Sequence, residues 1–591
     1  MLIQYKVSVL ILVLFLRCIT SLSQTGYEKI TVYKGIDYTE LPDPHPADAV
    51  SWKNAPAEVM VSFGSADLRY AKSKPPAITT AITQWRTTAW KGEKVHTQVV
   101  ISTKTPIKGL RITAGGLKDG KGHNIPATAV STGFVRFVLT DSLNKEGHGC
   151  GIDTTATAHR ELVADGIDCI AQKDLAAFTT QPVWVTIAVP QTAVAGKYTG
   201  LLYLHINGGT RTLPYSIQVK PFTLPSPAQW TYHLDLWQNP YAIARIYGVK
   251  EWSKEHLYRM RPFMQMLAGA GQKTITVSMI YDPWRSQTYD VYRSMIKWNK
   301  RKDGNWTYDY SIFDQWVGYM QSLGINKLIN CYTMVPWNNK FYYYDEASQR
   351  DTLLIAKTGT PEYEAHWRPM LTAFVHHLKQ KGWYHKTAIA MDERPLEDMQ
   401  KVIRLVRSVD RDLKISLAGS YHGEIADEVY DYCIASAEKF DSLVLRKRTN
   451  AGLPTTYYTY CYEGRPNTFT FSPPAESTWL GWYAANKQFN GYLRWAYNCW
   501  PRNPMQDSRF STWSAGDTYF VYPGGSSIRF ERLIEGIQDY EKIRVLKELY
   551  KDQPAKLQPL LDVIKEFETA ALNDQPAAAQ LQKAKAVLNA Y

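Results

Sequence analysis

The sequence lacks several motifs that would assign a function at once. It contains neither a CxxC nor an HExxH motif, and its His, Cys, Asp and Glu residues show no metal-site spacing. It also has no block of basic residues and no nucleic-acid motif, although its formal net charge is +13. Because Lys and Arg are dispersed, we interpret the charge as solvated surface, compatible with an acidic substrate or matrix. We therefore expect no metal and no nucleic-acid partner.

Long apolar runs are also scarce. The one candidate is residues 7–16, which follow Lys6 and precede a small-x-small cleavage site at 21–23. This run is short for a membrane span and is typical of a secretory signal peptide. We expect residues 1–23 to be that signal peptide, with no transmembrane segment after its cleavage. The mature protein is then periplasmic, extracellular or at the cell surface.

Cysteine is rare, with seven in 591 residues. Export permits disulfides. Cys150 and Cys169 share one loop region and are candidates for a pair, but the sequence does not decide whether they pair. The others after the signal peptide fall in predicted barrel strands, where small buried thiols are expected, and are Cys331, Cys433, Cys461 and Cys499.

Aromatic residues, in contrast, are abundant, with 19 Trp, 39 Tyr and 18 Phe. Many lie near predicted strand ends. Aromatic clefts suit carbohydrates because the C–H faces of a sugar pack on flat rings, although core packing is an equally ordinary use of each ring. The hydrophobic content of 45% and charged content of 21% are those of a globular protein.

The pattern of elements predicts a multidomain chain. Alternating β-branched runs such as 95–102 predict an all-β sandwich domain over residues 24–225, which ends at a Pro-rich joint. Strands and helices then alternate in eight pairs over residues 226–550, which predicts an α/β TIM (β/α)8 barrel. Residues 551–591 are expected to form a C-terminal helical tail.

Two adjacent carboxylates, Asp392 and Glu393, end the fourth predicted barrel strand. That strand, residues 387–391, is short and apolar, and a helix is expected after Pro395. Reactive residues of such barrels lie at the C-terminal ends of the strands. The other strand ends supply the expected substrate-binding residues His233, Asp235, Trp237, Trp284, Trp337, Tyr421, Tyr458, Tyr460, Trp495 and Asn498. A purely structural role remains open for each of them.

Adjacent carboxylates are poorly placed to flank a glycosidic bond in the usual way. Retaining glycosidases hold two carboxylates about 5–5.5 Å apart, usually from different strands. A substrate-assisted reaction suits the pair better, because a 2-acetamido group of the sugar can itself attack C1. Asp392 then orients this group, while Glu393 protonates the leaving oxygen and later activates water. Glu393 needs a raised pKa for this, which a desolvated aromatic pocket can provide.

The carboxylate pair resembles the catalytic pair of glycoside hydrolase family 123. Further blocks resemble that family's catalytic domain, and they are residues 495–500, 516–524, 527–532 and 535–541. The resemblance spans the barrel and the N-terminal β-domain. It implies a retaining, substrate-assisted exo-β-N-acetylgalactosaminidase that needs no metal or other cofactor. Its substrates would be GalNAc-terminated glycans, such as glycosphingolipid-type oligosaccharides.

Two alternatives stay open. One is a related exo-glycosidase for another hexosamine or an uncommon sugar, and the other is a non-catalytic glycan-binding barrel protein. The intact pair of Asp392 and Glu393 favours an enzyme, because a binding protein has no need of an acid/base pair at a strand end. The sequence does not decide the linkage, the aglycone or the oligomeric state.

Overall fold

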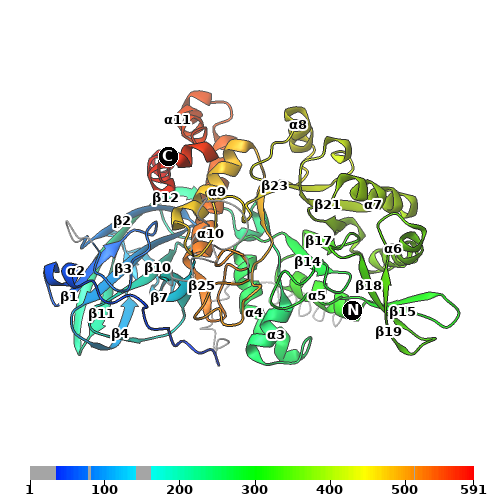
Figure 1. Ribbon diagram of the computed structural model, residues 1–591. Helices are drawn as coiled ribbons and strands as arrows, with labels where there is room; N and C mark the ends of the chain where they lie inside the picture. The colour runs from blue at the N-terminus through cyan, green and yellow to red at the C-terminus, as the bar shows by residue number, and fades with distance from the viewer. Residues whose placement is uncertain (1–34, 77–81, 142–160, 512) are drawn as a thin grey trace, which may run out of the picture.

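The computed structural model describes residues 35–76, 82–141, 161–511 and 513–591 (Figure 1). The expected signal peptide and Cys150 lie outside these ranges. The chain forms a sheet-rich N-terminal region, followed by a barrel-like parallel sheet with helices around it. Among the helices that the structure describes, none is long and apolar enough to cross a membrane.

The N-terminal region consists of a short helix and two sheets around one apolar core. The helix is α2 (Ala49–Asn54), and the strands are β1 (Val59–Gly64), β2 (Trp85–Lys91), β3 (Lys94–Thr103), β4 (Ile107–Ala114), β5 (Leu117–Lys118), β6 (Asn124–Ile125), β7 (Val130–Thr140), β8 (Glu161–Asp168), β9 (Lys173–Leu175), β10 (Thr179–Ala188), β11 (Gly196–Ile206) and β12 (Gly209–Thr223). One sheet has the order β1-β3-β10-β7-β8 and is extended by β25 (Gly525–Ser527), while the other follows the path β2-β12-β11-β4-β9. Alternating apolar residues of both sheets share the core, as expected of a sandwich.

The barrel-like sheet contains eight parallel strands. They are β13 (His233–Leu236), β14 (Thr274–Ser278), β17 (Leu328–Tyr332), β20 (Thr387–Met391), β21 (Lys414–Gly419), β22 (Asp431–Ala435), β23 (Thr455–Tyr458) and β24 (Gly491–Arg494). Their order is β13-β24-β23-β22-β21-β20-β17-β14. The two end strands meet through one parallel bridge, Leu234 with Gln272. The Gln272 side chain also accepts the Leu236 N–H at 3.0 Å, so a side-chain amide completes this seam.

Helices cover the outside of the barrel-like sheet and form the C-terminal tail. They are α3 (Pro240–Tyr247), α4 (Lys254–Gly269), α5 (Ser311–Ser322), α6 (Pro361–Lys381), α7 (Leu396–Val409), α8 (Ser442–Asn450), α9 (Pro474–Lys487), α10 (Ile528–Leu549), α11 (Pro554–Ile564) and α12 (Ala577–Ala590). One of the eight expected strand–helix pairs differs. Between β21 and β22 only a 3₁₀ turn forms, at Gly423–Ile425. The segment is too short for the usual helical crossover, which needs a dozen or more residues.

A small four-stranded sheet projects from two neighbouring loops. Its strands are β15 (Lys297–Lys300), β16 (Trp306–Asp309), β18 (Lys340–Asp345) and β19 (Arg350–Ile355), in the order β16-β15-β18-β19. It rests on α6, where the Trp298 ring stacks on His366 at 4.6 Å. The loops follow β14 and β17, so the insertion lies at the same edge of the parallel sheet as the carboxylate pair.

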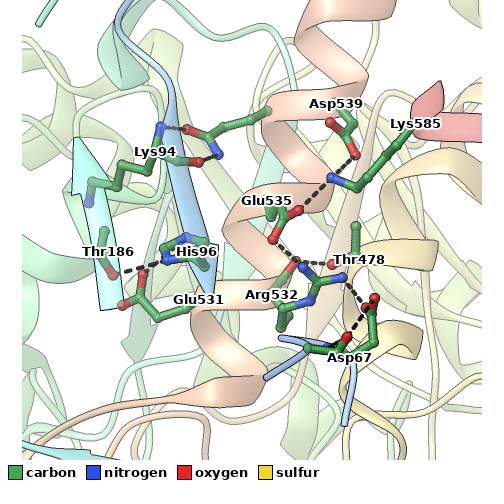
Figure 2. A network of polar contacts seen from close by, with 12 residues as sticks. Asp67, Lys94, His96, Thr186, Thr478, Glu531, Arg532, Glu535, Asp539 and Lys585 are labelled. Carbon is green, nitrogen blue, oxygen red and sulfur yellow. Dashed lines mark hydrogen bonds and ion pairs between the residues drawn. The ribbon is translucent and has the colours of Figure 1, made fainter. Parts of the chain in front are cut away.

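Helix α10 joins the N-terminal region to the barrel-like part (Figure 1). Arg529 pairs with Asp165 of β8 at 2.9 Å, and both side chains are fully buried. Figure 2 shows a second network, in which Arg532 contacts Asp67 while Lys585 of α12 bridges two acidic residues of α10. Buried charges therefore connect three parts of the chain.

The cysteines differ from expectation in two places. Cys169 is a free thiol, so the candidate pair with Cys150 does not form. Cys461, expected to be a buried thiol, is disulfide-bonded. Cys331, Cys433 and Cys499 are buried thiols, as predicted.

Candidate active site

The carboxylate pair lies in the turn between β20 and α7. All five residues of β20 are buried, and Asp392 and Glu393 follow directly at its C-terminal end. On the neighbouring strand, a Cβ at Gly419 would lie 3.3 Å from the Glu393 Cα. Glycine therefore lets β21 approach the backbone of the pair, and a larger side chain would displace it.

Asp392 is buried, and its two oxygens have different surroundings. Oδ2 accepts a hydrogen bond of 2.7 Å from the Trp337 indole N–H. Oδ1 lies 3.5 Å from Nε of Arg394, but it accepts no hydrogen bond from any residue that the structure describes. Burial raises the pKa of Asp392 to about 6, although Arg394 and Trp337 act in the opposite direction. The site thus holds a desolvated carboxyl with one oxygen available to a substrate donor.

Arg394 is one residue of the site that sequence analysis missed. Its guanidinium stacks on the Trp337 ring, 3.5 Å from the centroid, so Arg394 and Trp337 fix Asp392 together. The signal was its position directly after the pair.

Glu393 is exposed, in contrast to Asp392. The desolvated pocket that we expected around Glu393 is therefore not found, because burial acts on its neighbour. The Tyr458 hydroxyl, from β23, donates a hydrogen bond to Oε1 of Glu393. β23 is separated from β20 by two strands, so Tyr458 reaches Glu393 across the mouth.

Rings line the remainder of the mouth. Trp237 lies 5.0 Å from Trp284 and 4.5 Å from Tyr332, measured between ring centroids. Trp337, Tyr458 and Trp495 pack on this same cluster and are partly exposed. The structure thus brings together five of the predicted rings and adds Tyr332, which its place at the C-terminal end of β17 could have indicated. Of the two other predicted rings, Tyr460 lies 5.7 Å from Tyr458, measured between ring centroids.

The indole N–H groups of the two buried tryptophans in this cluster have no hydrogen-bond acceptor among the described residues. Nε1 of Trp237 and Nε1 of Trp284 are buried and find no acceptor within the described ranges. Buried donors of this kind are normally satisfied. They can therefore serve a polar group that enters the mouth.

His233 and Asp235 lie below the mouth rather than at it. His233 begins β13, at the opposite end of the sheet, with Nε2 3.7 Å from Oδ2 of Asp431 and 3.3 Å from Oγ1 of Thr274. Asp235 is 1% exposed, and burial, reinforced by Asp431, raises its pKa to about 7. Both belong to a buried polar cluster inside the sheet. Both side chains face the interior of the sheet, below the rings of the mouth, and their role in substrate binding stays a prediction.

Asn498 does not line the mouth either. It is fully buried, its side-chain oxygen accepts the Asn239 N–H at 3.0 Å, and its amide donates to the Asn239 carbonyl at 2.8 Å. Asn498 therefore fixes the start of α3. Asn498 thus has a structural role, whereas the sequence analysis had predicted that it binds substrate.

Tyr421 packs outward. Its ring lies 5.1 Å from Phe440 and 6.0 Å from Tyr432, and it belongs to the large core between sheet and helices. The β21 strand ends at Gly419, so the residues after it no longer follow the strand alternation on which the prediction relied.

Metal ligands are not gathered at this site. Across residues 35–76, 82–141, 161–511 and 513–591, no group of three or more His, Cys, Asp or Glu side chains is arranged to hold an ion.

A carboxylate pair at the C-terminal edge of a barrel-like sheet, inside an aromatic mouth, is an arrangement that glycoside hydrolases use. The family described as "Glycoside hydrolase 123, catalytic domain" matches residues 237–546, and "Glycoside hydrolase 123 N-terminal domain" matches residues 63–206. The chain belongs to glycoside hydrolase family 123.

A solved structure of the same family agrees with this assignment. A family 123 glycoside hydrolase from Clostridium perfringens, studied for "glycolipid glycan hydrolysis", is 25% identical, with 90% of this chain and 98% of that chain covered and a TM-score of 0.82. β-Glucuronidase 3 from Bacteroides uniformis is 12% identical over 82% of this chain and 52% of that one; its TM-score of 0.28 supports no argument. The comparison with curated proteins found no match.

Proposed function

We propose that the protein is an exo-acting, retaining β-N-acetylgalactosaminidase that uses the 2-acetamido group of its substrate as the nucleophile. The observation that supports this most directly is Oδ1 of Asp392, a buried acceptor without a hydrogen-bond donor among the described residues. An amide N–H bound there would satisfy it. The adjacent exposed Glu393 is free to reach a leaving oxygen at the mouth.

In the first step, the acetamido carbonyl oxygen attacks C1 and the bond from C1 to the leaving oxygen breaks. Glu393 transfers its proton to that oxygen, so the aglycone departs as an alcohol. Asp392 accepts a hydrogen bond from the amide N–H of the substrate and stabilises the positive charge of the resulting oxazolinium ring.

In the second step, water attacks C1 from the face that the aglycone left. Glu393 takes a proton from this water, and the ring opens to restore the acetamido group. Two inversions at C1 give net retention. The two roles follow from the surroundings of each carboxylate. Buried Asp392 stabilises the charge of the oxazolinium ring, while exposed Glu393 exchanges protons with the leaving oxygen and with water.

The mechanism requires a 2-acetamido group on any substrate. GalNAc and GlcNAc both carry this group and differ in configuration at C4. We therefore test aryl β-GalNAc against aryl β-GlcNAc over a range of pH. Faster hydrolysis of the first supports the proposal, whereas a preference for the second supports the alternative of a different hexosamine. Inactivity on every aryl hexosaminide, together with retained glycan binding, would instead support a non-catalytic barrel protein.

The natural substrate we propose is a GalNAc-terminated glycan, including glycosphingolipid-type oligosaccharides. Support comes from the similar enzyme of Clostridium perfringens, whose study concerns glycolipid glycans. A panel of such glycans, with release of the terminal sugar measured, tests this.

We also propose that the protein is exported after cleavage of residues 1–23. The disulfide at Cys461 supports this, because disulfides persist in oxidising compartments. N-terminal sequencing of the secreted protein should begin at Gln24.

The finer fold that we propose is a (β/α)8 barrel with one helix replaced by a 3₁₀ turn. The Lys273 N–H donates to the Leu234 carbonyl at 2.9 Å across the β13–β14 seam, which supports closure. Amide exchange at Lys273 should be as slow as within the sheet.

A further inference from the structure

Three tyrosines alternate along the chain from the end of β23 outward, and we call them the tyrosine row. They are Tyr458, Tyr460 and Tyr462. The ring centroids of the first two are 5.7 Å apart, and those of the last two are 6.1 Å apart with an angle of only 18° between their planes. The row therefore starts at the hydrogen bond to Glu393 and runs toward the surface.

The exposure of the row increases along it. Tyr458 and Tyr460 are partly buried, whereas Tyr462 is 51% exposed. Large exposed aromatic residues commonly mark binding surfaces when they continue a site. Here the continuity is direct, because the inner tyrosine donates its hydroxyl to Glu393.

The backbone beneath the row is held firmly. The Tyr460 N–H donates to the Glu463 carboxylate at 2.9 Å, and the Asn467 amide donates to the carbonyls of Tyr460 and Glu463 at 2.8 and 2.7 Å. Cys461, between the two outer rings, is disulfide-bonded. A platform that is ordered beforehand loses little conformational entropy when a ligand binds.

Acidic groups near the row restrict what it can bind. Burial, together with the charges of Glu463, Glu393 and Glu438, raises the pKa of Tyr460 to about 12. The same charges would repel an anionic ligand. The row therefore fits an uncharged ligand with flat apolar faces and hydroxyl groups.

We propose that Tyr460 and Tyr462 bind the saccharide on the leaving-group side of the scissile bond. This inference rests on the proposed function, because it takes Glu393 as the group that protonates the leaving oxygen. The first sugar attached to that oxygen must lie beside Glu393, where the row begins. Its C–H face packs on the rings while Tyr458 positions the Glu393 carboxylate.

The test compares two substrates of N-acetylgalactosamine. One is a neutral trisaccharide with terminal β-GalNAc, and the other is the β-glycosyl azide, whose small leaving group ends before the outer rings. We expect Tyr462→Ala to lower the ratio of kcat/KM, trisaccharide over azide, about tenfold, mainly through KM. Tyr462→Trp should keep this ratio within about twofold, since it retains a flat face.

The matched control is Tyr258→Ala, on the outer helix α4, where the tyrosine is 48% exposed. Its ratio should equal that of the wild type. An unchanged ratio in Tyr462→Ala, or an equal fall in Tyr258→Ala, would overturn the platform. A wild-type protein that hydrolyses neither substrate would contradict the proposed function itself, and the platform with it. A trisaccharide with an anionic group on its second sugar should be the poorer substrate, and the reverse order would also contradict the inference.

Discussion

The side chain of Asp392 is buried beside the stacked pair of Trp337 and Arg394, while that of Glu393 is exposed at the mouth. Both residues lie in the turn after β20, where Asp392 contacts Trp337 and Glu393 contacts Tyr458 from different sides of the mouth. Adjacency in the sequence thus gives two carboxylates of different character.

Asp392→Asn should lower kcat about 10²–10³-fold, because the amide cannot balance the charge of the oxazolinium ring. The loss should persist with aryl substrates, whose departure needs little help from an acid. Steady-state kinetics on aryl β-GalNAc measures this. Near-normal rates would rule out the substrate-assisted assignment.

Glu393→Gln should behave differently. For glycan substrates the rate should fall about 10²–10⁴-fold, since the leaving oxygen receives no proton. With a good aryl leaving group the loss of the first step should be much smaller. Equal losses on both substrates would contradict the role of Glu393 as general acid.

The raised pKa of Asp392 also predicts how stability depends on pH. Its folded pKa of about 6 exceeds the ordinary value of 3.8, so the folded state binds the proton more tightly. The contribution of Asp392 to the free energy of unfolding must then decrease as pH rises from about 4 to about 6. Asp392→Asn removes this dependence, so its stability relative to wild type should be up to about 3 kcal/mol greater at pH 8 than at pH 4. Urea unfolding at both pH values measures the difference.

Helices α9 and α10 pack unusually closely, and two glycines allow it. A Cβ on Gly481 would lie 2.1 Å from the Gly536 carbonyl oxygen. Gly481→Ala should therefore force the helices apart and lower the free energy of unfolding by about 1–3 kcal/mol.

Gly318→Ala in α5 is the matched control. An added Cβ at Gly318 meets no atom of the described residues within 4 Å. Alanine should there be neutral or stabilise the helix by up to about 1 kcal/mol. If both variants unfolded at the same urea concentration as wild type, the close packing of α9 on α10 would not be important for stability.

The assembly of the whole chain depends on buried charges around α10 (Figure 2). Lys585 lies 2.5 Å from Glu535 and 2.9 Å from Asp539. Burial raises the pKa of Glu535, but the charges of Arg532 and Lys585 more than offset it and hold this pKa well below its usual range. The contribution of Glu535 is thus present at neutral pH and is lost as pH falls.

Lys585→Met should leave two buried carboxylates without this partner and reduce stability by about 3 kcal/mol at pH 7. The deficit should shrink as the pH falls below about 4.5, where Glu535 is protonated in the unfolded chain. Lys583→Met, on the same helix with an exposed partner, should cost less than about 1 kcal/mol. Equal effects of the two substitutions would contradict the role of this network.

Local pattern was sufficient for much of the fold. The apolar strand over residues 387–391 and the helix after Pro395 agree with the predictions, because periodicity and the effect of proline act within a few residues. The missing helix after β21 was not anticipated, since strand–helix alternation says nothing about how short one crossover can be.

The position of Asp392 and Glu393 at a strand end was likewise readable from the chain, because a buried strand followed directly by two carboxylates is a local pattern. The depth of each site residue, the direction of its side chain and its contact partner could not be predicted from the chain. His233 lies at the N-terminal end of its strand, and the side chain of Asn498 is hydrogen-bonded to the backbone of Asn239. Asp392 is buried, whereas Glu393 is exposed. These outcomes depend on residues distant in sequence, such as Trp337 and Tyr458, whose contacts with the pair exist only once the strands lie side by side.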